Sequence, residues 1–224
     1  MQVFKILHYP HVLLRKKSTP VAENFLTSKD LQSFVDGMVE TMYAHQGIGL
    51  AAAQVGILKR IMVVDIKPYL GNPDLKDWHG SHQFEKDGVP TQITWPLRLV
   101  NPVITPSPET VRFPFDGCLS LPGVSSTDTT RAKSIELKAT DPWGAALTLK
   151  CDGILSICLQ HEMDHLEGVL FIDRLLHPEA DSDIQAEIAS WEDDPAVRKL
   201  ERKLKPVDAR KTKYDFVSVR NDPE

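Results

Sequence analysis

Apolar positions recur at helical spacing in the first third of the chain. A capping-box-like start at Thr27-x-x-Asp30 precedes apolar residues three and four positions apart, which predicts an amphipathic helix that stops at Gly47. The β-branched run RIMVVDI at residues 60–66 is short enough for a buried strand. The pattern therefore predicts a helix that leads through the glycine-rich loop GIGLAAAQVG into a strand. The apolar positions of the helix are Leu31, Phe34, Val35, Met38, Val39 and Met42.

Alternating strands and a second helix follow in the second half of the chain. The runs KSIELKAT and AALTLKC flank a four-residue turn at residues 141–144, which predicts a β-hairpin. The clearest helix of the chain begins after Asp152, a suitable N-cap, and ends before Gly168, a residue typical of helix C-termini. Its polar residues share one narrow face, so we expect a largely buried helix. These residues are Ser156, Gln160, Asp164 and Glu167.

Two segments differ from this pattern. Residues 67–96 are polar and rich in Gly, Pro, Asp and Lys, which predicts a long surface insertion in which His79 and His82 are solvated loop histidines. From about residue 174 the chain becomes rich in charged residues and in residues that favour helices. It ends in the polar tail KTKYDFVSVRNDPE. We therefore predict one α+β domain at residues 1–175 and a charged, partly helical C-terminal extension at residues 176–224, with no regular structure assigned to its tail.

Composition and charge narrow the class of protein. Of the 224 residues 42% are hydrophobic and 25% are charged, and a formal net charge of -5 excludes a globally basic nucleic-acid coat. No run approaches the roughly 18 apolar residues of a membrane helix, and the N-terminal segment lacks a signal-peptide pattern. Three cysteines are too few for a disulfide framework. We expect no membrane partner and a bacterial-type cytoplasmic protein, with an organellar location as the alternative.

The second helix carries the sequence HExxH. The i,i+4 spacing of His161 and His165 places both imidazoles on one face, with Glu162 close enough to converge on the same point. This arrangement favours a metal site in which two histidines are ligands and the glutamate carries protons. A catalytic site of this kind normally needs a third protein ligand, which must come from elsewhere.

The third ligand has several candidates, among them three cysteines, a remote histidine and a remote carboxylate. Cys158 lies on the same helix and Cys151 at a strand end, and both are more typical of packing thiols. Cys118 lies in FDGCLSLPG, a sharply turning extended segment that can present a thiolate and a free backbone N–H. We therefore favour Cys118.

Three blocks in this order resemble the peptide deformylase family: GIGLAAAQ at residues 47–54, DGCLS at residues 116–120 and QHEMDHLEG at residues 160–168. With the opening HYPHVLLRKKSTPV, the resemblance covers roughly residues 1–175. It implies a compact α+β fold in which antiparallel strands surround a buried HExxH helix. It also implies a metal-dependent hydrolase that removes the N-formyl group from the initiator formyl-methionine of nascent polypeptides and releases formate.

The resemblance assigns roles to individual residues. One divalent metal ion is held by Cys118, His161 and His165, with Fe(II) as the usual ion in the cell and Zn(II) or Ni(II) as substitutes. Glu162 moves a proton from water to the leaving amine. The side-chain amide of Gln54 and the backbone N–H of Leu119 donate hydrogen bonds to the developing oxygen charge.

Further residues are expected to bind the substrate. Gly47 and Gly49 permit close approach of an extended peptide, and apolar neighbours form a slot for the methionine side chain. These neighbours are Ile48, Ile154, Ile157 and Cys158.

Two departures from the family pattern affect the site. The family has Glu where this chain has Asp116, one methylene shorter, which predicts a strained or lost contact to a neighbouring basic residue such as Arg131 and reduced activity. The segment PGVSSTDTTR is longer than usual and lacks an intermediate basic residue, which leaves open how the peptide beyond the methionine is held.

Two rival functions and one partner complete the expectations. An HExxH metallopeptidase would take a downstream ligand such as His177 or Glu179, but it leaves the first two blocks unexplained. A catalytically weakened ribosome-binding homologue is the other rival. Residues 198–213 hold eight basic side chains against two acidic ones, and a short basic amphipathic helix there, beginning near Pro195 and interrupted at Pro206, would attract ribosomal RNA.

Overall fold

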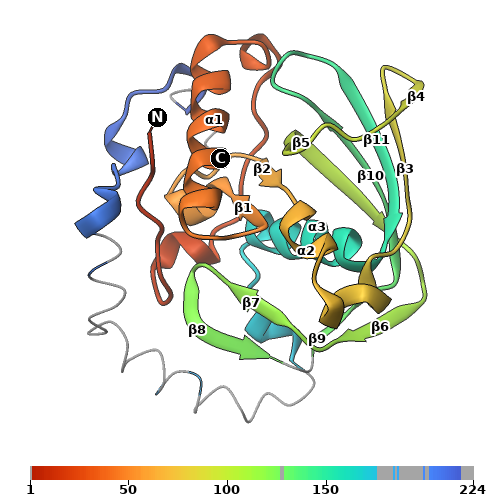
Figure 1. Ribbon diagram of the computed structural model, residues 1–224. Helices are drawn as coiled ribbons and strands as arrows, with labels where there is room; N and C mark the ends of the chain where they lie inside the picture. The colour runs from red at the N-terminus through yellow and green to blue at the C-terminus, as the bar shows by residue number, and fades with distance from the viewer. Residues whose placement is uncertain are drawn as a thin grey trace.

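The computed structural model describes residues 2–126, 129–175 and 202–217, and the single residues 184, 186 and 199. Within these residues, seven strands form one antiparallel sheet in the order β1-β2-β5-β10-β11-β3-β4, and the pairs β6-β9 and β7-β8 form two ribbons (Figure 1). The strands are β1 Gly49–Ala51, β2 Ile61–Val64, β3 His82–Lys86, β4 Val89–Thr91, β5 Leu97–Pro106, β6 Thr110–Phe113, β7 Asp116–Cys118, β8 Leu121–Ser126, β9 Thr129–Ala132, β10 Ser134–Thr140 and β11 Ala146–Asp152. The predicted strand at residues 60–66 and the predicted hairpin are confirmed as β2 and as β10 with β11. The α+β class is confirmed as well.

Helix α1 spans Lys29–Ala44 and packs on β1 and β2. Ser28 caps it, since its Oγ accepts a hydrogen bond from the backbone N–H of Leu31 at 3.1 Å. All six apolar residues predicted for its inner face are buried. The helix therefore begins close to the predicted start and ends shortly before Gly47.

Helix α3 spans Gly153–Glu167 and packs on β1, β2 and β11. Gly168 adopts a φ of 74° directly after it, a left-handed conformation that ends helices at little cost for glycine. Its predicted polar face is turned inward as well: the amide of Gln160 pairs with both backbone groups of Ala132 in β9 at 2.9 Å. The helix is thus largely buried, as predicted, and its polar residues satisfy neighbouring polar groups.

Part of the C-terminal segment belongs to the core. The backbone of Val207 pairs with the chain beside Phe4, with hydrogen bonds of 2.8 Å to both neighbours of that residue. Tyr214 and Phe216 are buried, with ring centroids 5.1 and 5.3 Å from that of Phe34 in α1. Some residues of the tail, to which the sequence assigns no regular structure, therefore cover α1, while the division of the chain at residue 175 stays a prediction.

Residues 67–96 are more structured than a surface loop. They contain α2 Lys67–Leu70, the 3-10 helix η4 Pro73–Trp78 and the hairpin β3-β4, which extends the main sheet beside β11 (Figure 1). The prediction of a surface insertion is wrong for Leu75 and Phe84, which are buried, whereas Leu70 and Val89 are exposed. His82 is exposed, as expected, but His79 is half-buried.

No described helix is long and apolar enough to cross a membrane. Smaller 3-10 helices join the main elements: η1 Val12–Arg15, η2 Glu23–Phe25, η3 Ala52–Val55, η5 Phe171–Arg174, η7 Ala209–Lys211 and η8 Asp215–Val217.

Candidate metal centre

Three potential metal ligands meet at the inner face of α3. Side-chain donor atoms of Cys118, His161 and His165 all lie within 4.8 Å of one another. Sγ of Cys118 is 3.1 Å from Nε2 of His165. The helix supplies both imidazoles from consecutive turns, and β7 supplies the thiol at its last residue, where the pairing with β8 shifts register. Two distant parts of the sequence are therefore joined at one point.

Asp116 orients one of the imidazoles. Its Oδ1 accepts a hydrogen bond of 2.8 Å from Nδ1 of His161, so the other ring nitrogen, Nε2, keeps its lone pair for a ligand. Its Oδ2 accepts from Thr129 at 3.0 Å and from the Arg131 guanidinium at 2.7 and 3.0 Å. The predicted strained or lost contact to Arg131 is therefore wrong, because strand β9 brings the guanidinium within reach of the shorter side chain.

Buried charges support this arrangement. Arg131 also donates to Asp164 at 3.0 Å, and Asp164 in turn accepts from Arg174 at 2.6 Å. Burial alone would raise the pKa of Asp116, but the interactions with His161 and with the Arg131 guanidinium outweigh it and hold this pKa well below its usual range. Asp116 is therefore ionised, and it accepts hydrogen bonds without donating one. Residues 127 and 128 of the segment before Arg131 lie outside the described residues.

Glu162 lies beside the three potential ligands but does not belong to their group. It is 3% exposed, and burial raises its pKa to about 7. Its Oε2 is buried and has no hydrogen-bond partner among the described residues. A Cβ at Gly49 would collide with its Oε1, so the glycine in β1 makes room for this carboxyl group. The position and pKa suit a group that takes and returns a proton near neutral pH.

The donor set fits a divalent transition metal. One cysteine sulfur and two imidazole nitrogens are the ligands that Zn, Fe and Ni accept, and three protein ligands leave a further position open. Burial lowers the pKa of His165 well below its ordinary value, which keeps this imidazole neutral and able to bind a metal. The unpartnered Oε2 of Glu162 leaves an acceptor for a water molecule in the same space.

The other cysteines pack in the interior. Burial raises the pKa of Cys151 to about 12 and that of Cys158 well above its ordinary value, so both stay protonated. Among the described residues, neither joins the donor group of Cys118. The alternative ligands His177 and Glu179 lie outside the described residues.

Gln54 reaches the donor group from η3. Its Oε1 accepts a hydrogen bond from the backbone N–H of Ala51 at 2.8 Å, which orients the amide. Its Nε2 then points to Sγ of Cys118 at 3.6 Å and to Oγ of Ser120 at 3.3 Å. The side chain is 1% exposed. A buried amide N–H, which can donate a hydrogen bond, therefore faces the three potential metal ligands.

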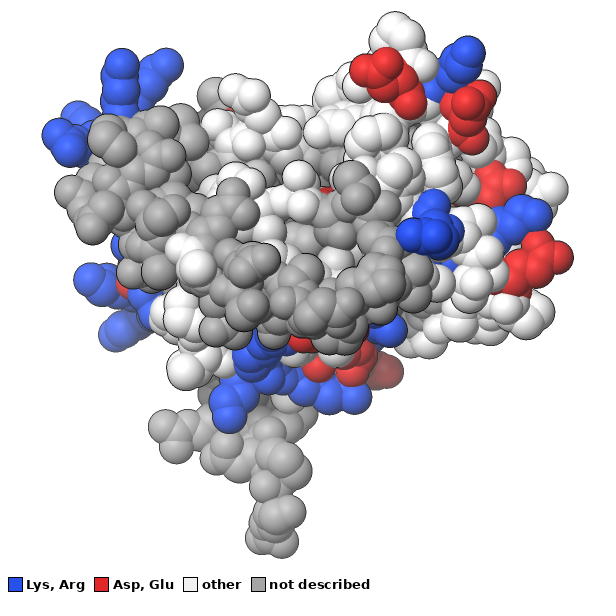
Figure 2. All heavy atoms as spheres, turned by 90° about the horizontal axis from the view of Figure 1, so that it is seen from below, with Lys and Arg blue, Asp and Glu red and all other residues white. Residues whose placement is uncertain are grey.

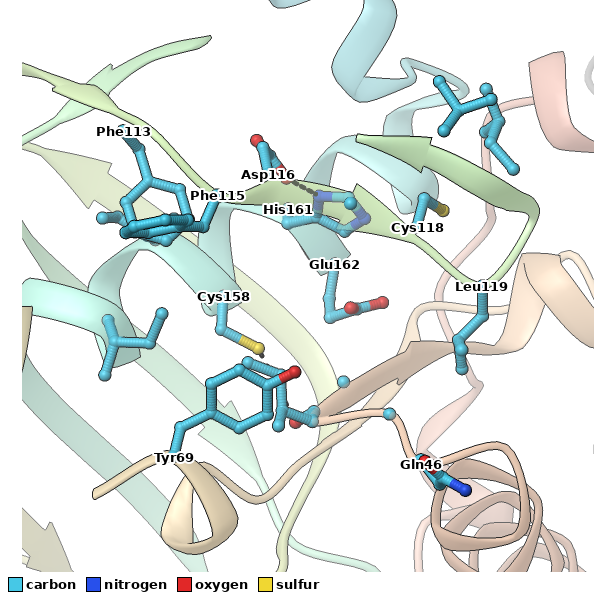
Figure 3. A pocket seen from close by; sticks show the side chains of 18 of the residues that line it. Gln46, Tyr69, Phe113, Phe115, Asp116, Cys118, Leu119, Cys158, His161 and Glu162 are labelled. Carbon is cyan, nitrogen blue, oxygen red and sulfur yellow. Dashed lines mark hydrogen bonds and ion pairs between the residues drawn. The ribbon is translucent and has the colours of Figure 1, made fainter. Parts of the chain in front are cut away.

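A cavity of about 340 Å³ opens in front of the donor group. Figure 3 shows Cys118 and Leu119 on one side of it, Phe113 and Phe115 on the other, and Cys158 and Glu162 between them. All the residues expected to contact the substrate line this cavity: Gly47, Ile48, Gly49, Leu119, Ile154, Ile157 and Cys158. Gly47 allows close packing, because a Cβ there would lie 2.7 Å from Cδ1 of Leu119.

Four large apolar residues of the cavity wall do not stand out in the sequence. Tyr69 and Leu75 come from residues 67–96, and Phe113 and Phe115 come from the segment before β7. No periodic pattern marks them, because each lies in a short element or a link between elements. Their only signal is a large side chain in a short segment rich in proline or charged residues: KPYLG, PDLKD and RFPFD.

Comparison with known proteins assigns the chain to a family. A family model described as polypeptide deformylase matches residues 3–181, which is most of the chain. The chain belongs to the peptide deformylase family. The peptide deformylase of Thermodesulfovibrio yellowstonii is 38% identical over 175 residues, which cover 78% of this chain and 90% of that protein.

Solved peptide deformylases share the fold. The crystal structure of the Legionella pneumophila peptide deformylase matches with a TM-score of 0.69 and 32% identity. The match covers 87% of this chain and 98% of the Legionella chain. A Met-ala-ser-bound structure from Acinetobacter baumannii has a TM-score of 0.65 and 30% identity, and it covers 77% of this chain and 98% of that one.

Peptide deformylases are metalloenzymes, and the Cys118, His161 and His165 group accords with this chemistry. The matched residues end at 181, so the segment that covers α1 at residues 207–216 lies beyond the family match. This chain therefore completes its core with residues that the family model does not include.

Proposed function

We propose that this protein removes the N-formyl group from the initiator formyl-methionine of nascent polypeptides and releases formate. The observation that supports this activity best is the position of the Cys118, His161 and His165 donor group at one side of an apolar cavity, with Glu162 beside it. Such a cavity suits an apolar side chain, and the donor group suits hydrolysis of an amide next to it.

Cys118, His161 and His165 would hold one divalent ion. We assign Fe(II) as the ion in the cell, with Zn(II) or Ni(II) as substitutes that the same ligands accept. When bound, the ion would act as a Lewis acid, which polarises the formyl oxygen and lowers the pKa of water.

The residues of the chain move the proton and stabilise the charge. Glu162 takes a proton from the attacking water and returns it to the amine nitrogen when the C–N bond breaks, so that formate and a free amino terminus result. Nε2 of Gln54 and the backbone N–H of Leu119 donate hydrogen bonds to the formyl oxygen as negative charge develops on it. The buried Nε2 beside Cys118 supports this role for Gln54.

The peptide lies along the glycine-rich segment before η3. Gly47 and Gly49 allow its backbone to approach closely, and Ile48, Ile154, Ile157 and Cys158 contact the methionine side chain. Binding of Met-ala-ser by the Acinetobacter baumannii relative supports a peptide that begins with methionine.

A formate-release assay tests the proposed activity. Protein purified without oxygen and analysed for metal is expected to release formate from formyl-Met-Ala-Ser, to stop after treatment with a chelator and to recover when Fe(II) is added. Cleavage of an unblocked peptide without release of formate would favour a metallopeptidase instead. No turnover by metal-replete protein would favour a homologue that only binds ribosomes.

We also propose that residues 198–213 bind the ribosome and that the protein acts in the cytoplasm of a bacterial-type cell, with an organelle as the alternative. Several exposed basic side chains support this partner: Lys199, Arg202, Lys203, Lys205, Arg210, Lys211 and Lys213. Figure 2, which views the molecule from below, shows basic side chains at the upper left, the lower left and the bottom, and acidic side chains at the right and the bottom. The predicted start of the helix near Pro195 lies outside the described residues, but residues 202–204 are helical.

Deletion of residues 198–213 would not test ribosome binding cleanly, because it would also remove the fully buried Ala209 from the core. Lys199→Gln, Arg202→Gln and Lys203→Gln together remove charge and leave the core intact. Co-sedimentation with ribosomes at two salt concentrations is expected to show weaker binding by this variant. A control variant with Lys138→Gln and Lys150→Gln, two exposed lysines of the main sheet, is expected to bind like the wild type. Equal binding by all three proteins would contradict the proposal.

A further inference from the structure

The cavity in front of the donor group has one wall that comes from residues 67–96. Tyr69 lies in α2 and Leu75 in η4, and both line the cavity. Leu75 is 3% exposed, and the ring of Tyr69 stands below Cys158 in Figure 3. Cys158 is one of the residues assigned to the methionine slot. The wall therefore meets the part of the cavity that would hold the substrate side chain.

The wall is fixed to the start of the metal-binding helix. β3 pairs with β11 up to His82 and Cys151, and beyond this pair Asp152 accepts hydrogen bonds from the backbone and side chain of Ser81. Gly153, the first residue of α3, has a φ of 63°, and a Cβ there would collide with the backbone oxygen of Trp78. The end of η4 and the beginning of α3 thus touch through their backbones. This contact holds the wall in a constant position relative to His161 and Glu162.

Aromatic rings continue the wall across the cavity. The rings of Trp78 in η4 and Phe113 in β6 pack edge to face, with centroids 5.1 Å apart. Phe115 follows, with its centroid 6.0 Å from that of Phe113, and it lines the cavity although it is 53% exposed. Asp116, Cys118, His161 and Glu162 also line the cavity, and Figure 3 shows all four on the Cys118 side of Phe115.

We infer that Tyr69 and Leu75 determine the specificity of this site for the side chain of the first residue. The wall of Tyr69, Leu75, Phe113 and Phe115 closes the slot on the side away from the donor group, and it limits the size of the side chain that enters. The Tyr69 hydroxyl is the one polar side-chain group of these four residues, so a charged side chain would lose its hydration there for little compensation, and the favoured class is an unbranched apolar side chain of methionine size. This inference rests on the proposed function.

Single substitutions in the wall test the inference with two substrates. Formyl-Met-Ala-Ser and the bulkier formyl-Trp-Ala-Ser are compared for the wild type, Tyr69→Ala and Leu75→Ala. We expect kcat/KM for the methionine substrate to fall about 10-fold in each variant, mainly through KM, because apolar contact is lost. The ratio of tryptophan to methionine turnover is expected to rise about 10-fold because the slot is enlarged.

Leu70→Ala is the matched control. Leu70 is the neighbour of Tyr69 in α2, it is 39% exposed, and it does not line the cavity. Both kinetic constants are expected to stay within about 2-fold of the wild type. Tyr69→Phe separates the ring from its hydroxyl and is expected to keep the wild-type ratio. Because Tyr69 is only half-buried, its variants keep the test open even where Leu75→Ala fails to fold.

The outcomes separate this inference from the proposed function. An unchanged substrate ratio in a folded Tyr69→Ala variant, with activity in the wild type, would overturn the inference alone. No formate release by the wild type would overturn the proposed function. Calorimetric binding of the product peptides Met-Ala-Ser and Trp-Ala-Ser then measures the same selectivity without catalysis, and equal ratios in the wild type and Tyr69→Ala would overturn the inference too.

Discussion

Asp116 accepts a hydrogen bond from Nδ1 of His161 at 2.8 Å, and this contact leaves Nε2 as the nitrogen that can bind a metal beside Cys118 and His165. The same carboxylate binds the guanidinium of Arg131, which is 4% exposed. Asp164 also binds this guanidinium, at 3.0 Å. The two aspartates therefore share one buried cation. Of the two, Asp116 is the one that also accepts a hydrogen bond from a predicted ligand, His161.

We expect Asp116→Asn to weaken metal affinity by about 10- to 100-fold, because the neutral amide no longer favours the tautomer that leaves Nε2 free. Competition with a chromogenic chelator measures this affinity. Asp164→Asn is the control, since it removes a carboxylate from Arg131 and leaves the hydrogen bond to His161 intact. Equal losses in both variants would assign the effect to Arg131 rather than to the imidazole.

Glu162→Gln is expected to retain the metal and to lose about 10²- to 10⁴-fold in kcat, because the amide preserves the shape of the side chain but cannot relay a proton. Metal analysis and formate release are measured on the same preparation. Turnover close to that of the wild type would remove Glu162 from the mechanism.

Gly49→Ala is expected to reduce kcat by about 100-fold, because the added methyl group displaces the carboxyl group of Glu162 from its position. Gly71→Ala provides the control, since nothing lies within 4 Å of a Cβ at that glycine. Formate release is measured for both variants at equal metal content. A Gly49→Ala enzyme as active as Gly71→Ala would show that the close contact in β1 is not required.

The Fe(II) form is expected to lose activity in air, because an open iron site beside a thiolate reacts with oxygen and Cys118 can be oxidised. The Zn(II) and Ni(II) forms are expected to decay more slowly, since neither ion readily changes its oxidation state. Activity is followed over time in air, and mass spectrometry detects oxygen added to Cys118. Equal rates for the three forms would exclude iron as the cause.

Phe216→Ala is expected to lower the free energy of unfolding by about 3 kcal/mol, because it empties a fully buried ring site against Phe34. Val207→Ala in the same segment is expected to change it by less than about 1 kcal/mol, since Val207 is 43% exposed and its backbone contacts remain. Urea denaturation measures both. A small effect of Phe216→Ala would mean that the segment contributes little to stability.

Long periodic elements could be predicted from the sequence. The inner face of α1 and both ends of α3 follow from spacing and end residues, and the HExxH spacing alone is enough to place His161 and His165 on one face. These features depend on residues close together in the chain, where geometry is set by the helix itself.

Features that depend on distant contacts could not be predicted in this way. Leu75 is a single apolar residue in a polar stretch, and its neighbours in the sequence do not reveal that it is buried in the wall of the cavity. The bond between Asp116 and Arg131 depends on how β7 and β9 are arranged in space, which the length of one side chain does not reveal. The same holds for Phe216, whose partner lies in α1.

The pairing of Val207 with the chain beside Phe4 has a consequence for the timing of folding. At about 5–20 residues per second, roughly 10 to 40 seconds separate the synthesis of these two residues on the ribosome. During that interval the apolar surface of α1 around Phe34 lacks the rings of Tyr214 and Phe216. The α1 side of the core therefore reaches its final packing only after Tyr214 and Phe216 have left the exit tunnel, although most of the strands of the sheet are made earlier.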